Sequence, residues 1–213
     1  MIDRFMAWLT IHGARALTGV QAQWFGCAPA EVQRVYFANH SSHFDFVLLW
    51  ASLPPHVRRT TRPVAAADYW TRSPARRFFI HRVFRGVLVR RGSGPASENL
   101  PAPQLDANPL QPMLEALDKG SSLIIFPEGT RGDGETLQPF KPGIYHLARL
   151  RPQVELVPVW MDNSYRVMPK GSFLPVPLLC SVRFGAPTRL HEDEDRAAFL
   201  ARLHHAVEEL RIL

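Results

Sequence analysis

Short runs rich in β-branched and aromatic residues alternate with helix-like stretches along most of the chain. The runs predict strands at 34–38, 64–67, 86–89, 122–126, 154–160 and 181–185. Apolar residues at helical spacing predict helices over 43–52, 73–84, 109–119, 141–150 and 192–210. This alternation predicts an α/β fold with a central mostly parallel or mixed sheet flanked by helices. The length of 213 residues suits a single domain.

The N-terminus is expected to be an amphipathic helical segment over residues 1–30, in front of an α/β domain over 31–213. Its apolar side chains at helical spacing are Ile2, Phe5, Met6, Leu9, Gly13, Ala16, Leu17 and Val20. Such a stripe either lies in a membrane interface or packs on the core of the domain. No stretch approaches the roughly 18 apolar residues that span a bilayer. We therefore expect a cytoplasmic protein that associates with the membrane at its periphery.

Cysteine usage and the N-terminal sequence agree with a reducing compartment. Cys27 and Cys180 lie far apart and have no neighbours at metal-ligand spacing, so neither a disulfide framework nor a metal site is expected. Asp3 and Arg4 are followed by only a short apolar run before His12, which is not the pattern of a signal peptide.

Positive charge is concentrated between Arg58 and Arg91. The net charge is +6, yet this segment alone has ten arginines and one acid, Asp68, which gives +9. Such a segment attracts phosphorylated small molecules, anionic lipid, an acidic carrier protein or nucleic acid. The alternative is an ordinary solvated surface, because 22 of the 25 basic residues in the chain are arginine.

Polar clusters begin where four of the predicted strands end. "NHSSHFD" follows the first strand, "RRG" the third, "PEGTRG" the fourth and "MDN" the fifth. In open α/β sheets, ligands bind at the carboxyl ends of strands. We therefore expect these clusters to meet in one crevice.

The first cluster offers a histidine and a carboxylate five residues apart. On one continuous helix His40 and Asp45 would lie about 140° apart, so they meet only if a helix starts between them. "SHFD" has the form of a capping box that predicts such a start, with Ser42 as N-cap. Asp45 is equally typical of an ordinary helix start, and His43 is expected inside the helix. No G-x-S-x-G elbow is present, so Ser41 and Ser42 are interpreted as turn and cap residues.

The second cluster, "IIFPEGTRGDG" (124–134), is an apolar strand that runs into a polar turn. Gly129 lets the backbone approach a ligand, Thr130 offers a hydroxyl, and Arg131 has the planar fork that suits phosphate. Glu128 either holds such an arginine or binds a ligand hydroxyl. The alternative is a tight turn with an ion pair.

Together these blocks resemble the 1-acylglycerol-3-phosphate acyltransferase family, which comprises the lysophosphatidic acid acyltransferases and related glycerolipid acyltransferases. "NHSSHFD" and "FPEGTR" are similar to its first and third signature blocks, and "PFKPG" (139–143) and "LVPVW" (156–160) to segments that follow in the same order. The second block departs from the family: "RGVLVRR" (85–91) has Arg90 where an acid is common. Arg91 is our choice for the family's phosphate-binding arginine, with Arg90 and Arg85 as alternatives.

The resemblance implies transfer of a fatty acyl group from a thioester to the free hydroxyl of 1-acylglycerol-3-phosphate, giving phosphatidic acid. The donor would be acyl-CoA or acyl carrier protein, with no cofactor and no acyl-enzyme. His40 would be the general base and Asp45 would orient it. The residues expected to hold the phosphate and glycerol of the acceptor are Arg91, Glu128, Gly129, Thr130, Arg131 and Lys141.

Other functions remain open from the sequence. Within the same class, the acceptor could be another lysophospholipid, or the acyl group could pass between lipids without a thioester. A lipid hydrolase would use the same histidine and aspartate on water. A non-enzymatic binder of anionic lipid or nucleic acid would use the 58–91 arginines, but it leaves the polar strand ends unexplained, so no nucleic-acid partner is expected.

Overall fold

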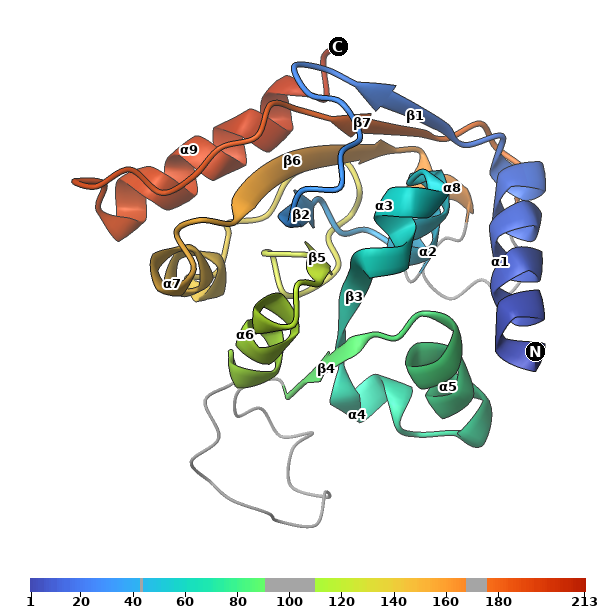
Figure 1. Ribbon diagram of the computed structural model, residues 1–213. Helices are drawn as coiled ribbons and strands as arrows, with labels where there is room; N and C mark the ends of the chain where they lie inside the picture. Colours follow the sequence, from blue (N-terminus) through green and yellow to red (C-terminus); the bar gives the residue numbers. More distant parts are fainter. Residues whose placement is uncertain (43, 91–109, 168–175) are drawn as a thin grey trace.

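The sheet at the centre of the molecule has seven strands in the order β1-β7-β6-β2-β5-β3-β4. The computed structural model describes residues 1–42, 44–90, 110–167 and 176–213 (Figure 1). The strand bounds are β1 Gln21–Trp24, β2 Arg34–Ala38, β3 Thr61–Ala66, β4 Val87–Val89, β5 Ser122–Ile125, β6 Glu155–Asp162 and β7 Ser181–Phe184. All six strands predicted from the sequence are present: β2 has the predicted bounds, and the other five have shifted ends.

The sheet is mixed, as expected. β6 and β7 pair antiparallel, while the other neighbours pair parallel, including β2 with both β5 and β6. Parallel strands that are covered on both faces are hydrophobic throughout, and every residue of β2 and β5 is buried. The carboxyl ends of β2, β5 and β6 therefore lie side by side at one edge of the sheet.

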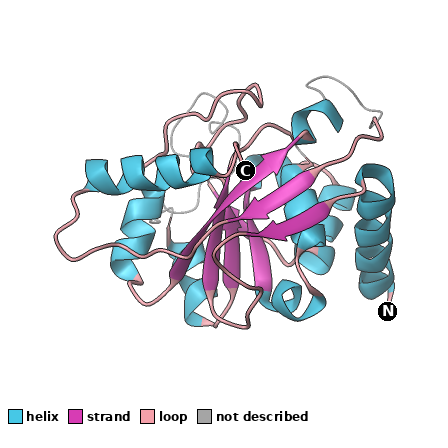
Figure 2. Ribbon diagram, turned by 90° about the horizontal axis from the view of Figure 1, so that it is seen from above, coloured by secondary structure: helices cyan, strands magenta, loops and turns pink. Residues whose placement is uncertain are grey.

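Helices cover both faces of the sheet (Figure 1, Figure 2). One face packs against α6 (Gln111–Asp118), α7 (Gly143–Leu150) and α9 (Arg196–Glu209). The other packs against α1 (Ile2–Thr18), α2 (Asp45–Ser52) and the π-helical η1 (Phe79–Val83). Four short helices complete the described chain: α3 Pro55–Thr60, α4 Ala67–Trp70, α5 Pro74–Phe78 and α8 Ser164–Val167.

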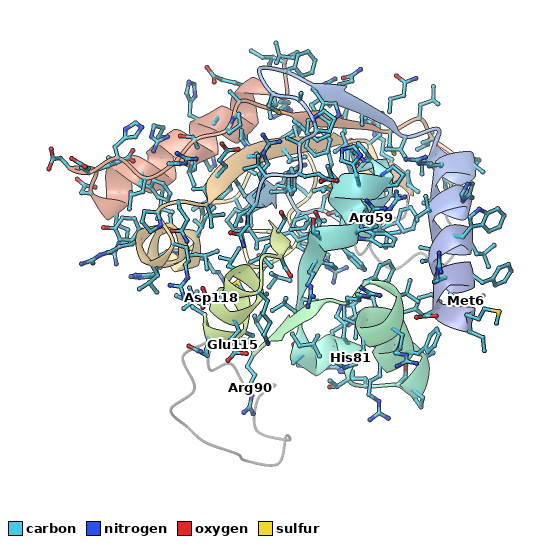
Figure 3. All side chains as sticks on the ribbon, viewed as in Figure 1. Met6, Arg59, His81, Arg90, Glu115 and Asp118 are labelled. Atoms are coloured by element: carbon cyan, nitrogen blue, oxygen red, sulfur yellow. The ribbon has the colours of Figure 1, made fainter. Side chains whose placement is uncertain are left out.

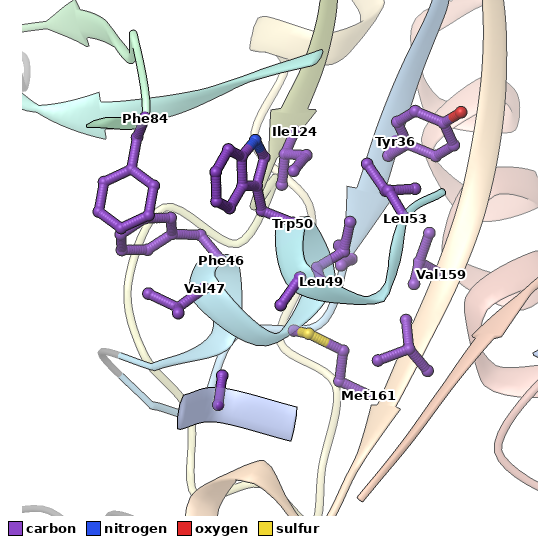
Figure 4. Close-up of a cluster of buried hydrophobic side chains, with 14 of the residues drawn as sticks. Tyr36, Phe46, Val47, Leu49, Trp50, Leu53, Phe84, Ile124, Val159 and Met161 are labelled. Carbon is purple, nitrogen blue, oxygen red and sulfur yellow. The ribbon is translucent and has the colours of Figure 1, made fainter. Parts of the chain in front are cut away.

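The sheet separates two hydrophobic cores, because side chains along a strand alternate between its faces. Tyr36 and Ile124 point into the core beneath α2, where Phe46, Trp50 and Phe84 form an aromatic cluster (Figure 4). The neighbouring strand residues point into the core beneath α6, α7 and α9; these are Val35, Phe37, Leu123 and Ile125. The single α/β domain predicted from the sequence is confirmed.

The first thirty residues are not helical throughout, which is a correction. α1 ends at Thr18, where Gly19 adopts the left-handed conformation at φ 51°, so Val20 lies outside the helical stripe. Gln21–Trp24 then forms β1, an edge strand that pairs parallel with β7. The sequence QAQW has little intrinsic β-propensity, so this strand depends on its tertiary partner.

Candidate active site

The polar cluster after β2 is tied to the end of β6 by Asn39. Its side-chain oxygen accepts a hydrogen bond from the Met161 N–H at 2.8 Å, and its amide nitrogen donates to the Met161 carbonyl at 3.0 Å. Ser41 Oγ lies 3.0 Å from Ser164 Oγ in α8. The strand ends predicted to converge are thus held together by side chains of the first cluster.

His40 and Asp45 meet, as the sequence predicts. His40 Nδ1 lies 2.9 Å from Asp45 Oδ2, and the Asp45 side chain is fully buried while the His40 side chain is 21% exposed. The same carboxylate oxygen accepts the backbone N–H groups of Ser41 at 2.6 Å and Ser42 at 2.8 Å. Because these donors fix the carboxylate, Asp45 holds the imidazole in one orientation. The imidazole ring also stacks on Phe126, with 4.3 Å between ring centroids.

The helix start between them differs from the predicted capping box. α2 begins at Asp45 with Phe44 as N-cap, rather than at residue 43 with Ser42 as N-cap. Only half of the box forms: Asp45 accepts from the Ser42 N–H, but Ser42 Oγ accepts from the Phe44 N–H at 3.2 Å. The carboxylate turns back toward the preceding loop, where its Oδ2 accepts the Ser41 and Ser42 N–H groups and lies 2.9 Å from His40 Nδ1. The expectation for His43 lies outside the described residues.

Glu128 fastens the backbone of the histidine. It is only 3% exposed; its Oε1 accepts the His40 N–H at 2.6 Å and its Oε2 accepts the Gln138 N–H at 3.0 Å. The His40 carbonyl in turn accepts the Gly132 N–H at 2.8 Å. Burial raises the pKa of Glu128, while the hydrogen bonds from His40 and Gln138 oppose that shift. Both carboxylate oxygens thus accept hydrogen bonds from inside the protein, and Glu128 is not among the residues that line the cavity beside His40. The expected contact of Glu128 with substrate stays a prediction, which this geometry does not favour.

The rest of the polar turn lines a cavity beside His40. Gly129 has φ 70°, and a Cβ built there would lie 2.8 Å from Lys141 Nζ, so a larger residue would displace the lysine. Lys141 is held in register by its backbone N–H, which donates to Pro127 O at 2.8 Å. Thr130 and Arg131 line the same cavity. Gly129, Thr130, Arg131 and Lys141 are thus brought together near His40.

The second block contributes an arginine to the cavity. Arg90, directly after β4, lines it, and Figure 3 shows this side chain at the lower edge of the molecule. Arg85 is exposed at φ 50° before β4 and is not part of the lining. The preferred candidate, Arg91, lies outside the described residues. Among those that are described, Arg90 is the arginine of this block that fits the expected position.

The cavity has a volume of about 690 Å³, within the usual range for small-molecule sites. Apolar side chains missed by the sequence reasoning form most of its wall, including Phe46, Trp70, Met113, Ile144 and Leu147. Their only sequence signal is helical or strand periodicity, which is shared with every core residue. In the described ranges, no group of three His, Cys, Asp or Glu side chains is placed to hold a metal ion.

Comparison with known proteins agrees with this architecture. A crystal structure of the 1-acyl-sn-glycerophosphate (LPA) acyltransferase PlsC from Thermotoga maritima matches all of this chain and 80% of that one, with a TM-score of 0.70 at 22% identity. At that identity the match establishes the fold.

The chain is also similar in sequence to two plant proteins. A 1-acyl-sn-glycerol-3-phosphate acyltransferase of Limnanthes douglasii is 38% identical over 79% of this chain, and one of Cocos nucifera is 33% identical over 86%. These matches cover 55% and 53% of the two relatives, so the chain spans about half their length. The family model described as Acyltransferase matches residues 26–162, from the approach to β2 to the end of β6. That match covers more than half of the chain, including both polar clusters, and the chain therefore belongs to the acyltransferase family.

Proposed function

We propose that this protein transfers a fatty acyl group from a thioester donor, acyl-CoA or acyl carrier protein, to the free hydroxyl of 1-acylglycerol-3-phosphate. The observation that carries the proposal is the His40–Asp45 pair, fixed at 2.9 Å at the wall of a cavity that also contains Arg90, Arg131 and Lys141. The pair supplies a base for a hydroxyl, the cations suit a phosphate, and the apolar wall suits hydrocarbon. The names of the relatives support the same acceptor.

In the proposed reaction, His40 acts through Nε2, because Nδ1 faces Asp45. The acceptor hydroxyl gives its proton to Nε2 as its oxygen attacks the thioester carbonyl carbon. The new C–O bond forms, the C–S bond breaks, and the thiolate takes the proton from the imidazolium. Asp45 stabilises the imidazolium between these two steps. Ester and thiol are the products, and no residue is acylated.

The cations would select the acceptor by its phosphate. Arg131 offers several N–H donors in a plane that matches phosphate oxygens, whereas Lys141 offers a compact charge. Lys141 Nζ lies over Gly129, where the absence of a side chain leaves room for the lysine itself at the cavity wall. Glu128 acts behind His40 in this scheme and does not contact the acceptor.

Purified protein should be assayed with each thioester donor against a panel of acceptors: 1-acylglycerol-3-phosphate, other lysophospholipids, and water alone. We expect transfer to the phosphate monoester, and its loss in His40→Ala. His205→Ala is the matched control, because His205 also lies beside a carboxylate, Glu209, but on the exposed face of α9. Near-normal transfer by His40→Ala would refute the mechanism. Fatty-acid release without an acceptor would favour a hydrolase, and transfer from a lipid donor would favour a transacylase.

We also propose that α1 contacts a membrane surface. Ile11 and Ala14 pack on the core, while four apolar residues near the start of α1 are 49–70% exposed: Ile2, Phe5, Trp8 and Leu9. Within the described ranges, no helix is long and apolar enough to cross a bilayer. Exposed apolar side chains on one side of a helix suit the interface between headgroups and acyl chains.

This contact is tested by sedimentation with vesicles. Phe5→Ser and Trp8→Ser together should reduce the bound fraction. Leu150→Ser should leave it unchanged, because Leu150 is a similarly exposed apolar residue at the end of α7, on the opposite face of the sheet. Equal binding of all variants would remove α1 from the contact.

A further inference from the structure

The cavity beside His40 crosses the sheet from one core to the other. Its lining includes Phe46, Ala65 and Trp70, which belong to the core beneath α2. It also includes apolar side chains of the opposite core, beneath α6 and α7: Val64, Val89, Met113, Ile144 and Leu147. A single cavity thus has walls on both faces of the sheet.

This crossing is possible because β3 changes its partner. β3 pairs with β5 only through Thr61–Pro63, and through Val64–Ala66 it pairs with β4 on its other side. Pro63, which has no N–H to donate, lies where the pairing changes. Beyond it, the edge of β3 that faced β5 borders the cavity instead of another strand. Ligand can therefore occupy both sides of the sheet plane.

We call the two parts wings. The aromatic wing is defined by Phe46, Ala65 and Trp70, where the rings of Phe46 and Trp70 meet edge to face at 5.5 Å between centroids. The aliphatic wing is defined by Val64, Met113, Ile144 and Leu147. His40 and Phe126, which stack on each other, line the cavity at the end of β2 and β5, where the wings meet.

Lys141 lies toward the aliphatic wing. It comes two residues before α7, the helix that carries Ile144 and Leu147. The aromatic wing instead adjoins the catalytic helix, since Phe46 follows Asp45 in α2. A ligand that carries both a phosphate and a hydrocarbon chain would therefore place its chain in the aliphatic wing.

We infer that the two wings hold two different hydrocarbon chains at the same time: the chain of the 1-acylglycerol-3-phosphate acceptor in the aliphatic wing and the transferred chain of the donor in the aromatic wing. This inference rests on the proposed function and adds the part of the cavity in which the hydrocarbon chain of each substrate binds. With the acceptor phosphate at Lys141 and Arg131, the ester-linked chain leaves from the neighbouring glycerol carbons toward α7. The thioester carbonyl must reach the hydroxyl at His40, so the donor chain extends on the other side, past Phe46.

β3 provides a matched pair of substitutions. Ala65 and Ala66 are consecutive, both line the cavity, and their side chains point to opposite faces of the sheet. Ala65→Leu adds the same three carbons to the aromatic wing that Ala66→Leu adds to the aliphatic wing. Any general effect of the larger side chain on β3 is shared, so a difference between the two variants reports the wing.

Each variant should be assayed with short- and long-chain donors at a fixed acceptor, and with short- and long-chain acceptors at a fixed donor. Ala65→Leu should lower kcat/KM for the long-chain donor about 10-fold or more and leave acceptor preference unchanged. Ala66→Leu should do the reverse. Activity on the unaffected substrate shows that each variant is folded, and Ala65→Val and Ala66→Val serve if a leucine is not tolerated.

Three outcomes overturn the inference: both variants shift preference for the same substrate, the two effects are exchanged, or neither variant shifts a preference. Failure of the proposed function would look different, because wild-type protein would then transfer nothing. In that event the wings are tested by binding of two probes, 1-acylglycerol-3-phosphate and a non-hydrolysable thioether of CoA. Ala66→Leu should weaken the first and Ala65→Leu the second, and any other pattern counts against the assignment.

Discussion

His40 and His205 each lie beside a carboxylate, yet the two pairs differ in everything that surrounds them. His40 Nδ1 is 2.9 Å from Asp45, and the two side chains are 21% and 0% exposed. His205 Nε2 is 3.3 Å from Glu209, and those side chains are 72% and 62% exposed. Similar distances therefore occur in a buried pair at a cavity wall and in a solvated pair on a helix.

The surface pair follows from helix geometry alone, because residues four apart lie on one face of α9. The buried pair needs a loop before α2, two backbone N–H groups on the carboxylate, and Glu128 on the histidine backbone. A histidine and a carboxylate become candidates for chemistry when other groups fix them beside a space for substrate. Removing these supports one at a time tests which of them the activity of His40 requires.

Among the groups that support His40, the largest effect is expected from Asp45→Asn. The variant loses the carboxylate charge opposite His40. If the amide nitrogen takes the place of Oδ2, it also loses the acceptor for the Ser41 N–H. The imidazolium is then less stabilised, and we expect kcat to fall about 10²- to 10⁴-fold, the range for loss of positioned acid–base catalysis. Steady-state kinetics with acceptor and donor both varied measure this. A decrease in kcat under 2-fold would mean that Asp45 contributes no more to transfer than the solvated Glu209 does.

Glu128→Gln should come next. An amide offers one acceptor oxygen where the carboxylate offers two, so it cannot accept from both the His40 and the Gln138 N–H groups. The His40 backbone then shifts, and a misplacement of about 1 Å costs about 10²-fold in rate. We expect kcat to fall while the KM for the acceptor stays nearly constant. A large rise in that KM with kcat preserved would instead restore the sequence-based expectation that Glu128 binds substrate.

Lysines offer a similar contrast, because Lys141 lines the cavity and Lys119 does not, so Lys141→Ala tests whether the cavity lysine binds the phosphate. Losing a charge-assisted hydrogen bond to phosphate costs about 1.5–3 kcal/mol, so the KM for the phosphate-bearing acceptor should rise about 10- to 100-fold. Lys119→Ala is the matched control, since Lys119 is exposed at the end of α6 and does not line the cavity. An acceptor without the phosphate should show no difference between the two variants. If it does, Lys141 acts on something other than the phosphate.

The elements of the fold were predictable where local pattern and burial agree. β2 and β5 are short apolar runs bounded by polar residues, and both were located within one residue. β1 was missed because QAQW acquires its conformation from β7, and Pro63 lies within β3 although a proline usually argues against a strand. Pairing between distant segments decided these cases, and that information is not local in the sequence.

The polar half of the site was predictable for a different reason. Clusters at strand ends, helix geometry and the family resemblance together located His40, Asp45, Gly129, Arg131 and Lys141. The direction of the Glu128 side chain was not predictable, because nothing in "FPEGTR" says whether its carboxylate points outward to a ligand or inward to the His40 and Gln138 N–H groups. The apolar wall of the cavity escaped notice because its residues follow the same periodicity as the core.

A smaller effect concerns stability and pH. Burial raises the pKa of Glu128 above its ordinary value of 4.5, so the folded protein binds this proton more tightly than the unfolded chain. The contribution of Glu128 to stability should therefore fall as pH rises from 4.5 through the raised pKa, and level off above it. Denaturant unfolding across this range, wild type minus Glu128→Gln, isolates that contribution from the other carboxylates. A difference that grows with pH would mean that the hydrogen bonds from His40 and Gln138 outweigh the burial.

The smallest effect is expected from Glu209→Gln. Its partner His205 is solvated, and exposed ion pairs on a helix contribute about 0.3–0.5 kcal/mol. The free energy of unfolding should change by no more than that, and kcat should stay at the wild-type value. Salt should erase even this difference, because exposed charges are screened. If Glu209→Gln lowered transfer as Asp45→Asn does, proximity to a histidine would be sufficient for activity, and the supports around His40 would lose their assigned role.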